Sequence, residues 1–262
     1  MFECVEVVRF DRKMSNGRTM PLLLACDGAD GEVEVIGKFS EGCSLGGLIR
    51  EAMTAMLAID LGLPVPPPYL VQLSDDFIDS IPDSSVATFL RKGDRFGFGS
   101  QRLPDAYAAW VKPAGKMSDQ LEQEALEIFA LDCWLTNGDR RIDNHNLLTN
   151  GKHFAIFDHE LALMADLNLF WKEPWKMNAL DGSRPPLEHV FFSHLQGRAT
   201  YPIDAICTRL ANLTDKRIND YAGALPPSWA RETETISKAR SFIMSLRDNL
   251  SPAGTELTRS LS

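Results

Sequence analysis

Three polar residues near the middle of the chain have the types and the order that handling of a magnesium nucleotide requires. Asp139 is followed five residues later by Asn144, and Asp158 comes directly after the short apolar run 154–157. In phosphoryl transfer from ATP, one carboxylate orients the attacking hydroxyl, while an asparagine and a second aspartate hold magnesium against the phosphate oxygens. Asp139 is therefore a candidate catalytic carboxylate, and Asn144 and Asp158 are candidate metal ligands.

The elements predicted around these residues help to distinguish a functional site from an ordinary polar turn. Polar side chains at such spacing also occur in turns, where they cap backbone groups, so the spacing alone equally fits an Asx-rich turn. Apolar residues at helical spacing precede Asp139, however, and the turn sequence Asn150-Gly151 precedes the strand-like run 154–157. A hairpin built on that turn would bring the two candidate metal ligands together.

The first forty residues predict a small antiparallel sheet. Three runs read as strands of a meander: 4–9, 21–26 and 33–39. The loop 15–19 is either a flexible hairpin turn or a loop whose backbone amides, together with Gly17 and Arg18, approach nucleotide phosphates. It contains a single glycine, so it is neither a Walker loop nor the glycine-rich loop of ordinary protein kinases.

A lysine and a glutamate near this sheet form a second candidate group. Lys38 lies near the end of the third predicted strand, and Ser44 can cap a following helix that carries Glu51 and ends at Gly62. Kinases use such a lysine–glutamate ion pair to fix the α and β phosphates of ATP. An exposed lysine at a sheet edge and a glutamate on a solvated helix face are the alternatives that the sequence leaves open.

The next segments predict less regular structure. Residues 74–95 are polar and predict a loop or an insertion without regular structure. The glycine- and aromatic-rich segment 96–104 suits a strap between two lobes, where adenine would rest beside Phe98 and Ser100. An irregular strand with a bulge is the alternative interpretation of this segment.

The C-terminal half predicts mainly helices. Asp119 begins a capping box, and the buried helix that follows leads directly into the loop of Asp139. Helical periodicity returns in patches as far as Leu250, whereas residues 251–262 are small and polar and predict a frayed tail.

Composition and charge narrow the class of protein. A chain of 262 residues, 44% hydrophobic and 24% charged, is typical of a globular protein with one large domain or two lobes. The net charge of −9 argues against direct nucleic-acid binding and against docking on an anionic membrane. Five cysteines without a CxxC pair predict neither a disulfide framework nor a zinc site. Without a signal peptide or a long apolar run, the expected compartment is the cytoplasm.

Two stretches resemble the catalytic and metal loops of the HipA-like kinases, bacterial relatives of the phosphoinositide kinases and, more distantly, of protein kinases. They are NGDRRIDNHNLL at residues 137–148 and IFDHELAL at residues 156–163. The resemblance implies an α+β, two-lobed, protein-kinase-like fold. Residues 1–103 would form an N-terminal lobe with a small antiparallel sheet and one helix, residues 104–250 a mainly helical C-terminal lobe, and residues 251–262 a flexible tail.

The resemblance also implies an ATP- and Mg²⁺-dependent phosphotransferase. Asp139 matches the catalytic carboxylate, Asn144 and Asp158 the magnesium ligands, Lys38 the phosphate-contacting lysine and Glu51 its orienter.

Arg141 and Ser15 are two further positions to which this resemblance gives a meaning. Relatives commonly carry histidine where this chain has Arg141, so Arg141 either serves the phosphate as a permanent cation or restructures the loop. Some HipA-like kinases are regulated by phosphorylation of a serine in the nucleotide loop, and Ser15 is the serine at that place here.

The expected phosphate acceptor is a serine or threonine of a protein. The protein could be the toxin of a toxin–antitoxin system, with an antitoxin or a regulatory protein as its partner. We expect no counterpart of the extra N-terminal subdomain of full-length HipA toxins in this sequence, so the resemblance does not imply their mode of antitoxin binding. The alternatives are a lipid or small-molecule kinase of the same fold and a catalytically silent pseudokinase. A weaker alternative is a metal hydrolase that would use His145, His153, His159, Asp158 and Glu160. His159 and Glu160 do not have the HExxH spacing of such enzymes.

Overall fold

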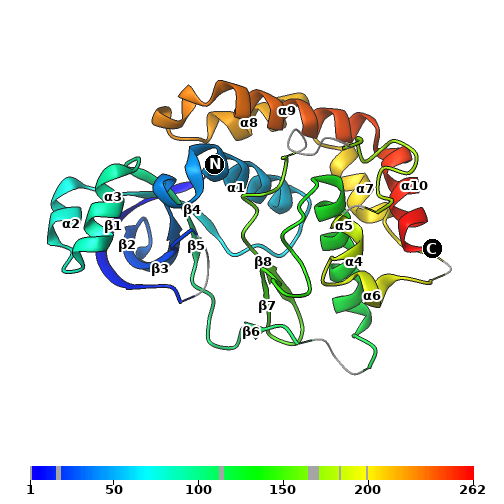
Figure 1. The fold of residues 1–262 in the computed structure, drawn as a ribbon, viewed down its shortest axis with the longest axis horizontal. Coiled ribbons are helices and arrows are strands. Elements are labelled where there is room, and N and C mark those ends of the chain that lie inside the picture. The colour runs from blue at the N-terminus through cyan, green and yellow to red at the C-terminus, as the bar shows by residue number, and fades with distance from the viewer. Residues whose placement is uncertain (1, 16–18, 112–114, 165–170, 183, 199) are drawn as a thin grey trace.

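The computed structural model describes residues 2–15, 19–111, 115–164, 171–182, 184–198 and 200–262 (Figure 1). A barrel of strands lies at one end of the molecule, helices fill the other end, and helix α1 (Ser40–Asp60) lies between them (Figure 1). The coarse prediction of an α+β protein with a sheet-rich N-terminal part and a helical C-terminal part is therefore confirmed. Within the described ranges, no helix has the length and apolar character that crossing a bilayer requires.

The N-terminal strands close into a barrel. In their order around it they are β1 (Glu3–Lys13), β2 (Leu22–Gly28), β3 (Gly31–Lys38), β5 (Phe96–Gln101) and β4 (Pro68–Gln72). The predicted meander of the first three strands is confirmed, but β1 and β4 run parallel, so the prediction of a purely antiparallel sheet is wrong. The chain crosses over through α1 before β4 begins, and this crossover lets β4 run alongside β1 in the same direction. Their pairing closes the sheet and protects its edges.

Strand β5 occupies most of the segment predicted as a strap. It pairs in unbroken register with both β3 and β4, so the strand interpretation is correct for residues 96–101, but without the bulge. Gly99 explains the close pairing, because a Cβ atom there would lie 2.3 Å from Val35 Cγ1 and 2.6 Å from Val71 Cγ2. A glycine is therefore needed where the side chains of Val35 and Val71 approach the backbone of β5. The connection toward the helical part begins only after Gln101.

The prediction of a loop over residues 74–95 is wrong, because this segment contains helices α2 (Asp75–Ser80) and α3 (Ser84–Lys92). The hydroxyl of Ser74 accepts a hydrogen bond from Phe77 N at 3.2 Å, and Asp83 caps α3 in the same way. Both helices cover the barrel with buried apolar side chains: Phe77, Ile78, Val86, Ala87 and Leu90. The prediction of one helix in the N-terminal part is also wrong for this reason.

Helix α1 connects the barrel to the rest of the protein. Its backbone kinks at Ser44, whose hydroxyl accepts a hydrogen bond from Gly47 N at 3.1 Å and so caps the longer segment, as predicted. Gly62, with φ of 68°, ends the helix in the left-handed conformation that glycine tolerates. The buried face of α1 packs in one hydrophobic cluster with the C-terminal helices, and Arg217 binds Asp60 through two nitrogens at 2.6 and 2.8 Å.

The C-terminal part combines a small sheet with helices. The sheet has the order β6 (Ala108–Ala109), β7 (Leu147–Thr149) and β8 (Phe154–Ile156). The helices are α4 (Asp119–Trp134), α5 (Arg184–Leu187), α6 (Phe192–Leu195), α7 (Asp204–Ala211), α8 (Asp215–Gly223), a 3-10 helix (Pro227–Arg231), α9 (Thr233–Asp248) and α10 (Leu250–Leu261). The predicted flexible tail is wrong, because α10 buries Leu257 and Leu261 and accepts a hydrogen bond from Trp134 at the carbonyl of Ala253.

Candidate active site

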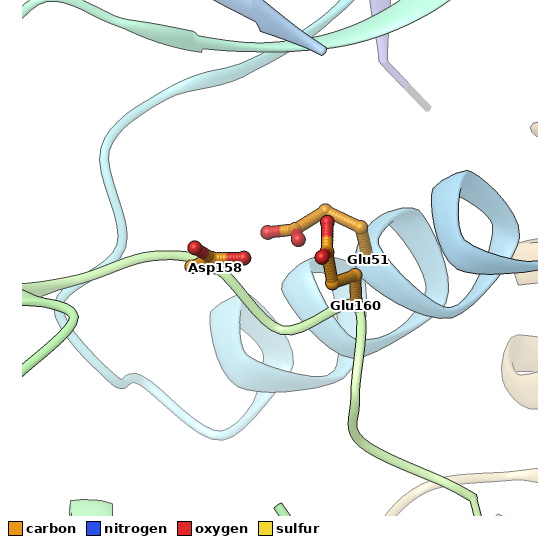
Figure 2. Close-up of side chains that lie close together, drawn as sticks. All are labelled: Glu51, Asp158 and Glu160. Atoms are coloured by element: carbon orange, nitrogen blue, oxygen red, sulfur yellow. The ribbon is translucent and has the colours of Figure 1, made fainter. Parts of the chain in front are cut away.

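A buried ammonium group and three carboxylates meet where the barrel faces α1. Lys38 Nζ lies 2.9 Å from Glu51 Oε2 and 3.2 Å from Glu160 Oε2, and it also contacts Asp158. Glu51 projects from α1, and Asp158 and Glu160 project toward it from the segment after β8 (Figure 2). We call these four residues the Lys38 cluster. Lys38 and Glu51 are both buried, so the alternatives of an edge lysine and a solvated glutamate do not hold.

The Lys38 cluster has an excess of negative charge. Burial disfavours the charged amine, yet the carboxylates of Glu51, Asp158 and Glu160 raise the pKa of Lys38. Burial and the neighbouring carboxylates raise the pKa of Glu160 to about 7, against the pull of Lys38. Burial likewise raises the pKa of Asp158, Lys38 opposes this, and the charges of Glu51 and Asp139 raise it further. A cation that entered beside Asp158 would therefore relieve repulsion.

Glu51 is held from both sides. Lys38 contacts its carboxylate from the barrel, and His159 donates its backbone N–H to Glu51 Oε2 at 2.8 Å. The ring nitrogen Nδ1 of His159 lies 3.4 Å from Glu51 Oε1. Burial opposes ionisation, but Lys38 and His159 together lower the pKa of Glu51. The tripeptide 158–160 thus contacts both members of the lysine–glutamate pair.

Glu51, Asp158 and Glu160 also have carboxylate oxygens within 4.8 Å of one another, close enough to share a metal ion. Lys38 Nζ already contacts all three side chains, so in this arrangement the group binds the lysine ammonium. The candidate magnesium ligands are then Asp158 and Asn144.

The loop after α4 holds the candidate catalytic carboxylate. The side-chain nitrogen of Asn144 donates to Asp139 Oδ2 at 2.9 Å, and that of Asn146 donates to the same oxygen at 2.8 Å. With its nitrogen committed to Asp139, Asn144 has its Oδ1 left for a cation. Asp139 and Asn144, which were predicted to share a site, are thus in contact, and Asn146 joins them without having been predicted.

A second buried charge cluster lies beneath this loop. Arg140 Nε donates to Asp132 Oδ2 at 2.6 Å, and Asn137 Nδ2 donates to Asp132 Oδ1 at 2.7 Å. His189 Nε2 lies 2.9 Å from Asp132 Oδ2. We call these four residues the Asp132 cluster. Sequence reasoning missed it, although a charged residue inside the apolar stretch of α4 was a signal that could have been found.

Hydrogen bonds connect the Asp132 cluster to the candidate catalytic groups. Asn137 Oδ1 accepts from Asp139 N at 3.3 Å, and Arg140 Nη1 donates to the carbonyl of Asn146. The same carbonyl accepts from Phe157 N at 3.3 Å, immediately before Asp158. Asp158 has a φ of 63°, a left-handed conformation that is uncommon for a residue other than glycine. The loop of Asp139 and the segment of Asp158 are therefore fixed to one buried scaffold.

Phe98 and Ser100, predicted to contact the nucleotide, line a crevice next to the Lys38 cluster. The crevice is narrow, and its walls also include Val65, Ile156 and Phe157. Phe98 is opposite Lys38 in the pairing of β3 with β5, so strand register fixes its place.

The remaining predicted residues have less definite places. Gly17 and Arg18 lie outside the described residues, whereas Ser15 is described and exposed. The side chain of Arg141 is about a quarter exposed, and its Nε lies 3.1 Å from Asp143 Oδ1.

The histidines do not support the metal-hydrolase alternative. His145 packs edge-on against Trp110, and His153 contacts Glu124 at 2.6 Å. In the part of the chain that the structure describes, the cluster able to hold a metal contains carboxylates and no histidine.

Comparison with known proteins identifies a family and a similar fold. A family model described as HipA-like kinase matches residues 7–256. Among solved structures, the crystal structure of the Helicobacter pylori proinflammatory kinase CtkA is similar over 97% of each chain, with a TM-score of 0.53 and 12% sequence identity. At this identity the similarity shows the fold alone. No curated protein matches the sequence.

Proposed function

Because the chain belongs to the HipA-like kinase family, we propose that it is an ATP- and magnesium-dependent phosphotransferase acting on a serine or threonine of a protein. One observation carries the proposal. Lys38, paired with Glu51, contacts Asp158, and the segment of Asp158 is hydrogen-bonded to the loop of Asp139 through Asn146. This arrangement supports one connected site, in which Lys38 would bind phosphate, Asp158 would bind the metal and Asp139 would act as the catalytic carboxylate.

The proposal assigns each part of the nucleotide to residues of this site. We assign the α and β phosphates to Lys38, which Glu51 orients, and the adenine base to the crevice beside Phe98 and Ser100. Gly17 and Arg18 would approach the phosphates from the loop between β1 and β2. The barrel and the helical part then act as the two lobes of a kinase, with the boundary near residue 103.

Asn144 and Asp158 would hold magnesium, whose charge neutralises the phosphate oxygens. The residues present fit such an ion. The nitrogen of Asn144 is committed to Asp139, which leaves its oxygen as the available atom, and Asp158 stands in a cluster with excess negative charge.

In the transfer step, the acceptor hydroxyl attacks the γ-phosphorus, the bond to the bridging oxygen breaks, and ADP leaves. The hydroxyl proton passes to Asp139, whose carboxylate is oriented by Asn144 and Asn146. Arg141 lies in the same loop and would stabilise negative charge on the transferred group.

A protein is the acceptor that we favour. The net charge of −9 disfavours docking on anionic lipid. Exposed Ser15, beside the proposed nucleotide loop, is the proposed site of self-phosphorylation. A role as a cytoplasmic toxin with an antitoxin partner is part of the same proposal and rests on the family alone.

The decisive variant is Asp139→Asn, which keeps the size of the side chain but removes the base. We expect transfer of radiolabelled phosphate to fall by about 10²- to 10⁴-fold, with an unchanged melting temperature. Asp76→Asn, an exposed aspartate on α2, is the matched control and should retain activity. Undiminished transfer in Asp139→Asn would refute the role of this carboxylate, and label recovered on lipids or metabolites instead of protein would refute the proposed acceptor.

A further inference from the structure

Asn146 has an unusual backbone conformation in the candidate active site. Its φ is 45°, in the left-handed region that asparagine, aspartate and glycine adopt more readily than other residues. Its side-chain nitrogen donates to Asp139 Oδ2 at 2.8 Å, and its carbonyl oxygen accepts from Phe157 N at 3.3 Å and from Arg140 Nη1. A single residue therefore contacts the catalytic carboxylate, the buried guanidinium and the segment that carries Asp158.

These contacts complete a closed ring of hydrogen bonds. Arg140 and Asn137 both donate to Asp132, and Asn137 accepts from the backbone N–H of Asp139. Asn146 joins the two ends of this chain, since its side chain donates to Asp139 and its carbonyl accepts from Arg140. A ring of this kind fixes the direction of the Asp139 side chain relative to the buried scaffold.

The left-handed backbone at position 146 and the need for a donor to Asp139 together explain why this residue is asparagine. The left-handed backbone turns the carbonyl toward Arg140, and among the residues that favour this backbone only asparagine carries a short side chain with an N–H donor. Aspartate would place a second negative charge against Asp139, and glycine would leave that oxygen without this donor.

Asn144 and Asn146 differ in the ligand role that we assign to each. Asn144 also donates to Asp139 Oδ2, at 2.9 Å, but its oxygen is assigned to magnesium. No ligand role is assigned to Asn146. Because both amides converge on Oδ2, Oδ1 is the oxygen that we assign to the acceptor hydroxyl.

We propose that Asn146 is a positioning residue for phosphoryl transfer, whose carboxamide orients the Asp139 carboxylate toward the acceptor hydroxyl. This inference rests on the proposed function. It predicts that loss of the carboxamide slows turnover without weakening nucleotide binding, because the carboxamide donates to the catalytic carboxylate, whereas the segment of Asp158 is contacted by the backbone carbonyl, which the substitutions keep.

The test uses the full chain and two substitutions that keep the left-handed backbone. For Asn146→Gly we expect kcat to fall about 10- to 100-fold, the range for loss of one hydrogen bond to a charged group, with an unchanged KM for ATP. Asn146→Asp should be slower still, because its charge repels Asp139. Asn178→Gly is the matched control, since Asn178 is exposed and also left-handed, with φ of 61°; it should keep wild-type kcat.

The order of activities separates positioning from a turn-forming role. A residue needed only for the turn would tolerate glycine and aspartate equally, so wild-type kcat in both variants would overturn the proposal. It would also be overturned if Asn146→Gly were unfolded by circular dichroism, or if KM for ATP rose while kcat stayed constant. An inactive wild-type protein would instead refute the proposed function, and the positioning role with it.

Discussion

The Asp132 cluster and the Lys38 cluster are built from similar groups but differ in charge balance and exposure. In the Asp132 cluster one carboxylate meets the guanidinium of Arg140, and the side chains involved are almost inaccessible to solvent. In the Lys38 cluster, an ammonium group meets three carboxylates, and Asp158 and Glu160 stay partly exposed, at 24% and 16% of their side chains.

This difference indicates which cluster serves stability and which serves ligand binding. Burying charges costs several kcal/mol per ion unless pairing and hydrogen bonding are complete, as they are around Asp132. A cluster with excess charge at a partly open site is unfavourable by itself and becomes favourable when a cation arrives. We therefore regard the Asp132 cluster as a scaffold and the Lys38 cluster as part of the proposed binding site for the magnesium nucleotide.

The largest effect that would test this comparison is expected for Arg140→Met. The substitution leaves the carboxylate of Asp132 buried without its cation, which should lower the free energy of unfolding by about 3–5 kcal/mol. Urea denaturation of the variant and the wild-type protein measures the change. Arg231→Met, at an exposed arginine of the 3-10 helix, provides the control and should change stability little. A loss below about 1 kcal/mol in Arg140→Met would show that Arg140 is not a stability determinant.

The pH dependence of stability offers a second test of the scaffold. Burial by itself would raise the pKa of Asp132, but Arg140 and His189 outweigh this effect and hold that pKa well below its usual range. Burial lowers the pKa of His189. In both cases the unfolded chain takes up protons before the folded protein does, so stability is lost as the pH falls. The loss should begin near pH 6.5 through the histidine and continue below about pH 4 through the aspartate.

His189→Gln isolates the histidine contribution. Glutamine has an N–H donor for Asp132 but no titrating ring, so the dependence of unfolding free energy on pH should flatten between about pH 6.5 and 5. Urea denaturation across that range is the measurement. If the variant and the wild-type protein share the same slope, His189 does not contribute in the way its burial implies.

Local signals in the sequence were enough to predict several features of the fold and the site. Ser44 and Gly62 mark helix ends by residue type, and Lys38 and Glu51 belong to adjacent elements, so their meeting needed no knowledge of distant contacts. The caps of α2 and α3 were also present in the sequence, but charged residues around their short apolar faces obscured the periodicity.

Features that depend on distant contacts were not predicted. The parallel pairing of β1 with β4 and the burial of α10 each join segments far apart in the chain. The roles of Asp132 and Asn146 were missed for a different reason, because they depend on a local ring of side-chain and backbone hydrogen bonds between α4 and the loop after it. Residue types alone cannot show such a ring, because asparagine and aspartate are common in turns for unrelated reasons.

The smallest expected effect concerns Glu160→Gln, and its sign distinguishes the two clusters. The substitution removes one excess negative charge from the Lys38 cluster and preserves side-chain size, so the nucleotide-free protein should become more stable by up to about 1 kcal/mol. Activity should fall about 3- to 10-fold in kcat/KM, because glutamine holds the Lys38 ammonium less firmly. Glu6→Gln, at an exposed position of β1, should change neither quantity. Destabilisation by Glu160→Gln comparable to that of Arg140→Met would mean that the carboxylates of the Lys38 cluster are needed for stability, and the contrast between a balanced scaffold and an unbalanced binding site would not hold.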